Sequence, residues 1–252
     1  MHEQPTLTGV SAVAFDLDGT LVDSAPDISH ALNSALAQEG LQRFDLATVR
    51  AWIGDGPDAL IASALAAQGM PPDHPRRQSG ALAQRLRRGF DVATLAAPLA
   101  EGKVYAGIAD LVTGLYKRLP MVVITNKPTP LARAVLDAAD LLPYLSGVRG
   151  ADTPAQRKPA PLSLLAAAKD LGVAPSALLM VGDGPADMLA AEAAGCPSAL
   201  VAWGYGSHAI PAHLRPRPIA TPQQLLSELL GSLPTDALSR DVQHGRDRIF
   251  NT

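Results

Sequence analysis

The sequence has little cysteine, little net charge and no long apolar run, and each shortage excludes a class of protein. Cys196 is the only cysteine among 252 residues, so the chain cannot form an internal disulfide and suits a reducing compartment. A formal net charge of −3 argues against non-specific binding to nucleic acid or to an anionic membrane. No uncharged apolar stretch is long enough to span a bilayer, and the N-terminal residues lack a secretory pattern. We therefore expect a soluble cytoplasmic protein that binds neither nucleic acid nor membrane.

The remaining composition is that of an ordinary globular protein, with 47% hydrophobic and 18% charged residues. A chain of this length is expected to form one large domain or two smaller ones. From about Val104 onward, apolar runs typical of buried parallel strands alternate with segments of helical spacing. The expected strands lie at residues 10–15, 121–125, 146–148, 178–182 and 199–203. This alternation predicts an α/β fold with a doubly wound parallel sheet.

The segment between the first two strands reads differently, because it is helical throughout. Apolar residues recur at helical spacing from Ile28 to Leu36 and again from Leu60 to Ala66. One crossover helix would suffice to join two parallel strands, so several helices here predict an inserted helical subdomain. We expect residues 1–24 and 99–234 to form the α/β core, residues 25–98 the insertion, and residues 235–252 a loosely ordered tail.

Two aspartates follow the first expected strand, where residues 15–20 read FDLDGT. Open α/β sheets bind ligands at the carboxyl ends of their strands, which is where Asp16 and Asp18 lie. Two carboxylates so close together are costly unless a positive group neutralises them. A hard divalent cation such as Mg²⁺ takes oxygen ligands, so the pair predicts a metal-assisted site for an anion.

Polar residues also follow the other expected strands. Thr125 and Asn126 end one strand, Asp183 and Asp187 follow another, and Lys158 precedes a helix. Taken singly, each has a plainer interpretation: an aspartate caps a helix or forms a turn, and a lysine beside prolines is solvated. Together they place two acidic clusters, a hydroxyl and a cation on one edge of one sheet. We interpret that combination as a functional site.

These residues resemble the motifs of a known superfamily. Residues 16–24, DLDGTLVDS, resemble the first motif of the haloacid dehalogenase superfamily in its phosphatase form. Thr125 is similar to the second motif, Lys158 to the third, and Asp183 with Asp187 to the fourth. Residues 49–56 (VRAWIGDG), 194–197 (AGCP) and 203–206 (WGYG) are similar to bacterial phosphoglycolate phosphatases. The resemblance covers most of the chain, and it implies a Rossmann-like core with an inserted helical cap of the small-substrate type.

The resemblance also implies roles for the site residues. Asp16 is expected to attack phosphorus and form an aspartyl phosphate, while Asp18 acts as general acid and then general base. Mg²⁺ is expected to be held by Asp16, the backbone carbonyl of Asp18 and Asp183, with Asp187 orienting these ligands. One departure is Gly184, where the family often has serine or threonine. We expect this change to alter metal affinity without abolishing the chemistry.

Substrate contacts follow from the same resemblance. Thr125 and the backbone amide of Asn126 would donate to phosphoryl oxygens, and Lys158 would balance the charge of the phosphate and of Asp16. In the cap, Arg50, Gly54 and Gly56 are candidates for contacts with the organic part of a small phosphorylated metabolite.

Several functions are compatible with the sequence. The first is a Mg²⁺-dependent phosphatase, with 2-phosphoglycolate as the favoured substrate. A sugar-phosphate phosphatase or a phosphomutase of the same superfamily is the second. A receiver-like signalling domain, from another class, also combines acidic residues, a threonine and a lysine at strand ends, but the helical insertion and the Asp-x-Asp spacing argue against it. The sequence leaves open whether the protein is a monomer or a homodimer.

Overall fold

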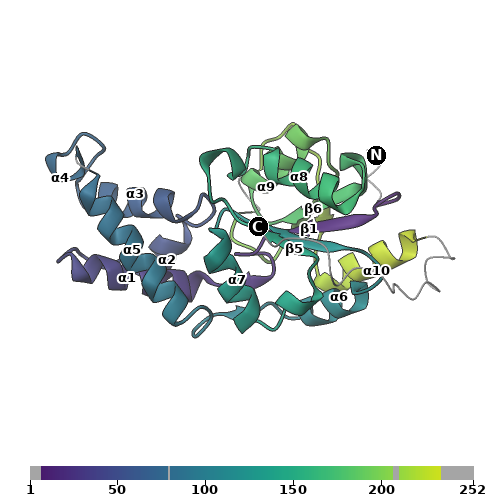
Figure 1. The fold of residues 1–252 in the computed structure, drawn as a ribbon, viewed down its shortest axis with the longest axis horizontal. Helices are drawn as coiled ribbons and strands as arrows, with labels where there is room; N and C mark the ends of the chain where they lie inside the picture. Colours follow the sequence, from purple (N-terminus) through teal and green to yellow (C-terminus); the bar gives the residue numbers. More distant parts are fainter. Residues whose placement is uncertain (1–6, 79, 207–209, 234–252) are drawn as a thin grey trace.

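A computed structural model of the chain describes residues 7–78, 80–206 and 210–233. The tail expected at residues 235–252 lies outside the described residues. Figure 1 shows a bundle of helices at one end of the molecule and a sheet with helices above and below it at the other. Within the described residues, no helix has the length and apolar character needed to cross a bilayer.

The larger part is built on a six-stranded sheet in which every neighbouring pair is parallel. Its strand order is β5-β4-β1-β6-β7-β8. The strands are β1 (Ala12–Phe15), β4 (Met121–Ile124), β5 (Gly147–Arg149), β6 (Leu178–Gly182), β7 (Ser198–Val201) and β8 (Arg217–Ile219). The predicted α/β class and parallel sheet are confirmed. The edge strand β8 was not predicted.

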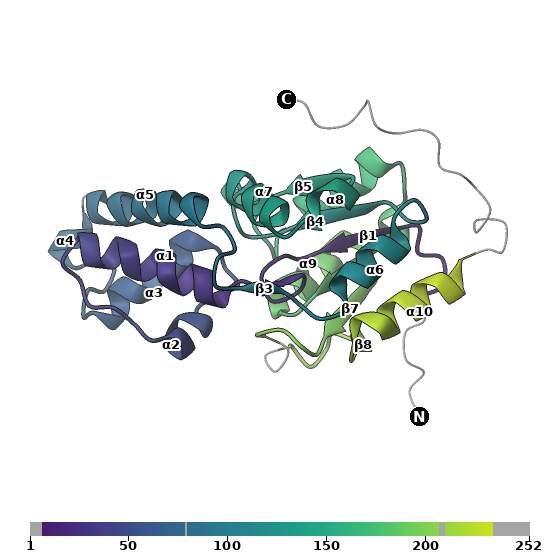
Figure 2. The ribbon, with the colours of Figure 1, turned by 90° about the horizontal axis from the view of Figure 1, so that it is seen from below.

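Helices cover both faces of this sheet, as a doubly wound fold requires (Figures 1 and 2). Val13 and Phe15 of β1 point to a core shared with α6 (Ile108–Leu115), α7 (Thr129–Ala138) and α10 (Pro222–Ser232). Ala12 and Ala14 point to the opposite core, beneath α8 (Leu162–Leu171) and α9 (Pro185–Ala194). Successive side chains alternate between faces, so an unbroken apolar strand buries both. Short 3-10 turns lie at Leu142–Tyr144, Pro154–Gln156 and Pro175–Ala177.

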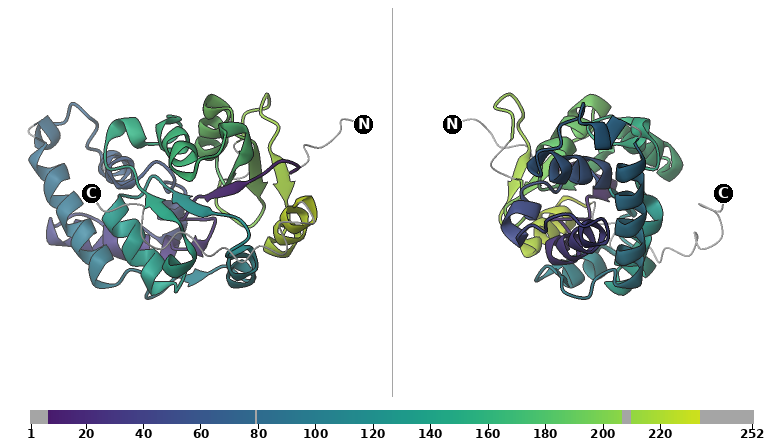
Figure 3. Two further views of the ribbon diagram at one scale, coloured as in Figure 1. Left: turned by 45° about the vertical axis from the view of Figure 1, so that its right-hand side comes forward. Right: turned by 90° about the vertical axis from the view of Figure 1, so that its left-hand side faces the viewer.

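The helical part has a hydrophobic core of its own. Its helices are α1 (Ala25–Gln38), α2 (Leu46–Arg50), α3 (Pro57–Ala67), α4 (Pro75–Gln78) and α5 (Ala81–Ala96). As expected, the segment 25–98 contains no strand in its described residues, which are all but residue 79. The apolar stripes of α1, α3 and α5 meet in one cluster that includes Leu32, Leu36, Leu65 and Leu86, all fully buried. Figure 3 shows these helices stacked beyond one end of the sheet.

Two chain segments join the helical part to the sheet, and they run side by side. Strand β2 (Val22–Asp23) pairs antiparallel with β3 (Lys103–Val104), a ribbon that the sequence did not predict. The carboxylate of Asp27, in the first turn of α1, accepts hydrogen bonds from the backbone N–H groups of residues 100, 101 and 102 at 2.7–2.8 Å. These contacts tie the start of the helical part to the segment that leaves it.

Candidate active site

The carboxyl end of the sheet carries the residues that the sequence singled out. Strand β1 lies between β4 and β6, so Asp16 stands between Thr125 and Asp183, each just beyond the end of its strand. The chain turns sharply after Asp16 because Gly19 has a φ of 86°, a conformation that favours glycine. A Cβ on Gly19 would lie 2.4 Å from an oxygen of Asp183. Glycine at this position therefore lets the first and fourth motifs come together.

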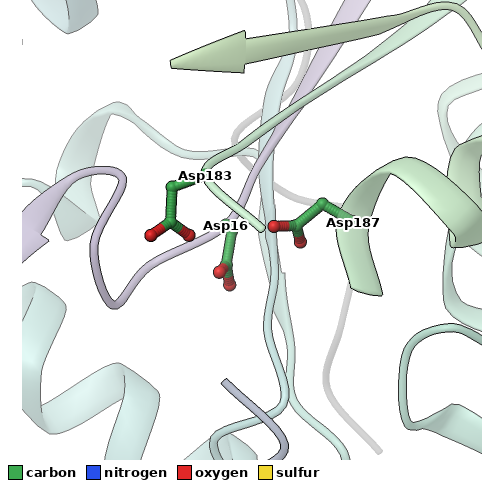
Figure 4. Close-up of side chains that lie close together, drawn as sticks. All are labelled: Asp16, Asp183 and Asp187. Carbon is green, nitrogen blue, oxygen red and sulfur yellow. The ribbon is translucent and has the colours of Figure 1, made fainter. Parts of the chain in front are cut away.

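Three carboxylates meet at this edge. Oxygen atoms of Asp16, Asp183 and Asp187 all lie within 4.8 Å of one another, and all three residues are buried. Figure 4 shows them converging from the end of β1, the loop after β6 and the first turn of α9. Such a set of buried carboxylate oxygens matches what a hard divalent cation takes as ligands. The residues present therefore fit a bound metal ion.

Lys158 supplies the cation that faces this acidic cluster. Its ammonium lies 2.8 Å from Asp16 Oδ1 and 2.6 Å from Asp187 Oδ1, and it donates to the carbonyl oxygen of Ile124 at 2.9 Å. The residue is 2% exposed, so the plain interpretation of a solvated lysine is wrong. One positive charge facing three carboxylates leaves an excess of negative charge in a buried place. This imbalance favours a further cation at the site.

The pKa values of the cluster reflect the same imbalance. Burial, reinforced by the charges of Asp187 and Asp183, raises the pKa of Asp16 to about 7, against the opposing effect of Lys158. Burial and Asp187 likewise raise the pKa of Asp183 to about 6. For Lys158, burial alone would lower the pKa, but Asp16 and Asp187 outweigh it and raise the pKa above its ordinary value. Asp16 and Asp183 thus ionise at higher pH than an ordinary aspartate, and additional positive charge would favour their ionised forms.

Asp18 lies apart from this cluster, with partners that the sequence analysis missed. Both of its carboxylate oxygens accept from the ammonium of Lys127, at 2.8 and 2.9 Å, and Oδ1 also accepts from the Ser24 hydroxyl at 2.5 Å. The only signal for Lys127 was its place beside Asn126 at the end of β4. Of the four predicted metal ligands, three contribute carboxylates to the cluster, whereas the Asp18 carboxylate is engaged elsewhere. A role for the Asp18 backbone carbonyl stays a prediction.

The residues after β4 connect the sheet to the helical part. Thr125 is 3% exposed, and its hydroxyl accepts from the Lys127 backbone N–H at 3.2 Å. The Asn126 side chain donates to the carbonyl of Gly54 at 2.9 Å and to that of Lys158 at 3.1 Å, and it accepts from the Lys158 backbone N–H at 2.8 Å. Asn126 therefore holds the Lys158 loop and the residue 54 turn in place. The roles predicted for Thr125 and for the Asn126 backbone amide stay predictions.

Two cavities reach the site between the sheet and the helical part. A cavity of about 40 Å³ is lined by Asp16, Asp18 and an apolar wall. That wall consists of Ile28, Ile53, Pro57, Leu60 and Phe90. A larger one, of about 460 Å³, is lined by the acidic cluster, Lys158, Arg50 and Tyr205. Gly54 lines both cavities and Gly56 the first, so the three predicted cap residues lie at the site.

Tyr205 is another contact that the motif pattern did not reveal. Its backbone N–H donates to Asp183 Oδ2 at 2.6 Å, and its hydroxyl donates to Asp23 Oδ1 at 2.7 Å. The guanidinium of Arg50 lies over its ring, 5.4 Å from the centroid, and 3.6 Å from Asp23. Gly204 allows this loop to approach, because a Cβ there would lie 2.2 Å from the Asp183 Cβ. Tyr205 thus links the acidic cluster to the segment that leads into α1.

The departure at Gly184 leaves the acidic cluster in place. The Gly184 backbone N–H donates to Asp187 Oδ2 at 3.1 Å, which fixes that carboxylate at the start of α9. A Cβ on Gly184 would meet only an Asp187 oxygen, at 3.9 Å, so the position has room for a side chain. The missing hydroxyl has therefore not been replaced by closer packing.

The fold and this arrangement of motifs agree with a family comparison. The model of the haloacid dehalogenase-like hydrolases matches residues 10–195, so the chain belongs to that family. Among curated relatives, the phosphoglycolate phosphatase of Rhodospirillum rubrum is 41% identical over 195 residues, which cover 77% of this chain and 80% of that protein. The phosphoglycolate phosphatase of Escherichia coli K12 is 38% identical over 209 residues, with 78% and 82% covered.

Solved structures agree on the fold. The crystal structure of a predicted phosphoglycolate phosphatase from Haemophilus somnus 129PT superimposes with a TM-score of 0.79 at 26% identity, covering 87% of this chain and 98% of that one. CbbY from Rhodobacter sphaeroides, in complex with phosphate, has a TM-score of 0.73 at 23% identity, covering 87% and 99%. The predicted superfamily membership is confirmed, and the receiver-like alternative is wrong.

Proposed function

We propose that this protein is a Mg²⁺-dependent phosphatase that hydrolyses 2-phosphoglycolate to glycolate and phosphate. One observation carries the proposal: Asp16 lies within the buried acidic cluster beside Lys158, while Asp18, two residues further on, is held separately by Lys127 and Ser24. A nucleophile and an acid–base group are thereby kept in different surroundings. The names of the curated relatives support the choice of phosphoglycolate.

The acidic cluster is the proposed place for Mg²⁺. Asp16 and Asp183 would hold the ion, together with the Asp18 backbone carbonyl, and Asp187 would orient this set. The raised pKa values of Asp16 and Asp183 support this proposal, because ionised carboxylates there need more positive charge than Lys158 supplies. When bound, the ion supplies the positive charge that lets an anionic carboxylate approach an anionic phosphoryl group.

Each residue at the site then has a separate role in the proposed reaction. An oxygen of Asp16 forms a bond to phosphorus as the bond to the ester oxygen breaks, and Asp18 gives its proton to that oxygen. Asp18 next takes a proton from a water molecule, whose oxygen attacks phosphorus and releases phosphate from Asp16. Thr125 and the backbone amide of Asn126 would donate to phosphoryl oxygens. Lys158 would hold the Asp16 carboxylate in line throughout.

The helical part would act as a cap over this reaction. We propose core boundaries of 1–24 and 99–234, with the cap at 25–98, because the apolar residues of the helical part gather in a separate cluster, to which the core part contributes Leu131. Arg50, Gly54 and Gly56 would line the space for the organic part of the substrate. The proposal places the enzyme in the cytoplasm, as a monomer or homodimer, acting on a small phosphorylated metabolite without nucleic-acid or membrane partners.

A phosphate-release screen tests this function directly. Purified protein would be assayed against phosphoglycolate, other small phosphate esters and hexose phosphates, with Mg²⁺ and with a chelator. We expect Mg²⁺-dependent release that is fastest with phosphoglycolate. Turnover confined to hexose phosphates would instead favour a sugar-phosphate phosphatase or phosphomutase, for which the larger cavity has room. Equal rates with chelator would contradict the metal requirement.

A further inference from the structure

Lys127 is a buried cation at the site to which none of the family motifs above assigns a role. Its side chain is 4% exposed, and its ammonium contacts both oxygens of Asp18 at 2.8 and 2.9 Å. An ammonium carries three N–H donors, and the Asp18 carboxylate takes two of them. A third donor is left for another acceptor, and Lys127 itself lines the smaller cavity.

The surroundings of Lys127 determine what that acceptor must be. The apolar wall of the cavity consists of Ile28, Ile53, Pro57, Leu60 and Phe90. Among the described lining residues, Lys127 is the one with a positive charge. A carboxylate entering such a space loses its water, so it needs a cation and hydrogen-bond donors in return. Neutral leaving groups of similar size have no such need. Lys127 is therefore the place in this cavity where a leaving group with a carboxylate would bind more tightly than a neutral one.

We propose that Lys127 binds the carboxylate of the substrate and so selects phosphate esters whose leaving group carries an acid next to the ester oxygen. The inference rests on the proposed function and identifies the residue behind its specificity. Asp18 must lie within hydrogen-bond reach of the ester oxygen to protonate it. A single methylene joins that oxygen to the carboxylate of phosphoglycolate, and Lys127 is already in contact with Asp18. The same geometry thus brings the carboxylate to Lys127.

Arg50 is the competing cation, and its contacts argue against this role. Its guanidinium stacks on the Tyr205 ring and faces Asp23, and its side chain is 44% exposed. It lines the larger cavity with the acidic cluster and Asp18, whereas the smaller cavity, which Lys127 lines, is lined without it. A solvated arginine that already has partners discriminates less between charged and neutral ligands than a desolvated ammonium does.

The test compares two esters that differ only in the group Lys127 is proposed to bind. Ethyl phosphate carries a methyl group where 2-phosphoglycolate carries its carboxylate. The measured quantity is the ratio of kcat/KM for phosphoglycolate to that for ethyl phosphate, in the wild-type enzyme with Mg²⁺ and in the variants Lys127→Met, Lys127→Gln and Arg50→Met. Because both esters use the same nucleophile and acid, damage to Asp18 affects both rates and cancels in the ratio. Thermal melting shows which variants are folded, and Lys127→Gln serves if Lys127→Met is not.

Losing a charge-assisted contact in a desolvated place should lower the ratio roughly 10- to 100-fold in the Lys127 variants. Arg50→Met should leave the ratio within about threefold of wild type, even if both rates fall. Two results would overturn the inference while the proposed function stands: an unchanged ratio in the Lys127 variants, or a collapse of the ratio in Arg50→Met instead. A wild-type enzyme that does not prefer phosphoglycolate would refute the proposed function itself, and the inference with it.

Discussion

Without divalent metal, the protein should become less stable as pH rises from about 5 to 8. In the folded chain, burial raises the pKa of Asp16 to about 7 and that of Asp183 to about 6, from an ordinary value of 3.8. The folded state therefore binds protons more tightly than the unfolded state does. Stability from these two groups is complete below the unfolded pKa and is lost as pH rises through the folded pKa.

The size of the effect follows from the two shifts. One pKa unit corresponds to about 1.4 kcal/mol. Between pH 5 and the folded pKa of each group lie about two pH units for Asp16 and about one for Asp183. The free energy of unfolding should therefore fall by up to about 4 kcal/mol between about pH 5 and pH 8. Mg²⁺ binds the ionised carboxylates and competes with protons, so its stabilising effect should grow over the same range.

Urea unfolding followed by tryptophan fluorescence measures the free energy of unfolding and its increase with Mg²⁺. The signal reports on both parts of the molecule, because Trp52 lies in the helical part and Trp203 beside the sheet. Curves would be recorded with chelator and with saturating Mg²⁺ across this pH range. Asp183→Asn should weaken the pH dependence and the Mg²⁺ effect, whereas Asp137→Asn, an exposed residue on α7, should change neither. A metal-free stability that stays constant or rises with pH would refute the reasoning. An equal stabilising effect of Mg²⁺ at about pH 5 and about pH 8 would also refute it.

Three further substitutions test the site. Asp16→Asn should lower turnover by at least about 10³-fold without unfolding the protein, and retained activity would reject Asp16 as nucleophile. Lys158→Ala should raise KM and slow turnover. Urea unfolding without metal should show a loss of about 3–5 kcal/mol of stability, because the substitution leaves buried carboxylates unpaired. A normal rate would mean that Lys158 has only a structural role. Gly204→Ala should weaken Mg²⁺ binding and slow turnover at least about tenfold, because its Cβ would collide with Asp183, while Gly231→Ala, which meets nothing within 4 Å, serves as the control. Matching activity in these two glycine variants would mean that the loop adjusts freely.

The main strands could be predicted because their signal is local. Each of β1, β4 and β6 is a run of mostly apolar residues buried on both faces, and a polar residue follows each strand directly. Strand β8 was missed because Arg217 and Pro218 interrupt any apolar run. It forms because the edge of β7 is free to pair with it. The ribbon of β2 and β3 was missed for a related reason, since strands of two residues carry too little pattern to detect.

The candidate site likewise contains residues that the sequence could predict and contacts that it could not. Asp16, Thr125, Lys158 and Asp183 were predictable because each stands in a recognisable motif and parallel strands bring their carboxyl ends to one edge. The partner of Asp18 was not predictable, because Lys127 lies 109 positions away and has no motif of its own. The hydrogen bond from Tyr205 to Asp23 spans 182 positions in the sequence. It depends on the close approach of the residue 203–206 loop to Asp183, which glycine at position 204 permits.

By itself, the sequence determined the α/β class, the helical insertion and the chemical groups available at the strand ends, since hydrophobic periodicity and motif spacing act over neighbouring residues. Only the tertiary structure decided how those groups are paired: Lys158 with the acidic cluster, and Lys127 with Asp18. Charge pairing acts through space over a few ångströms, and the order of strands in the sheet sets which charges come that close.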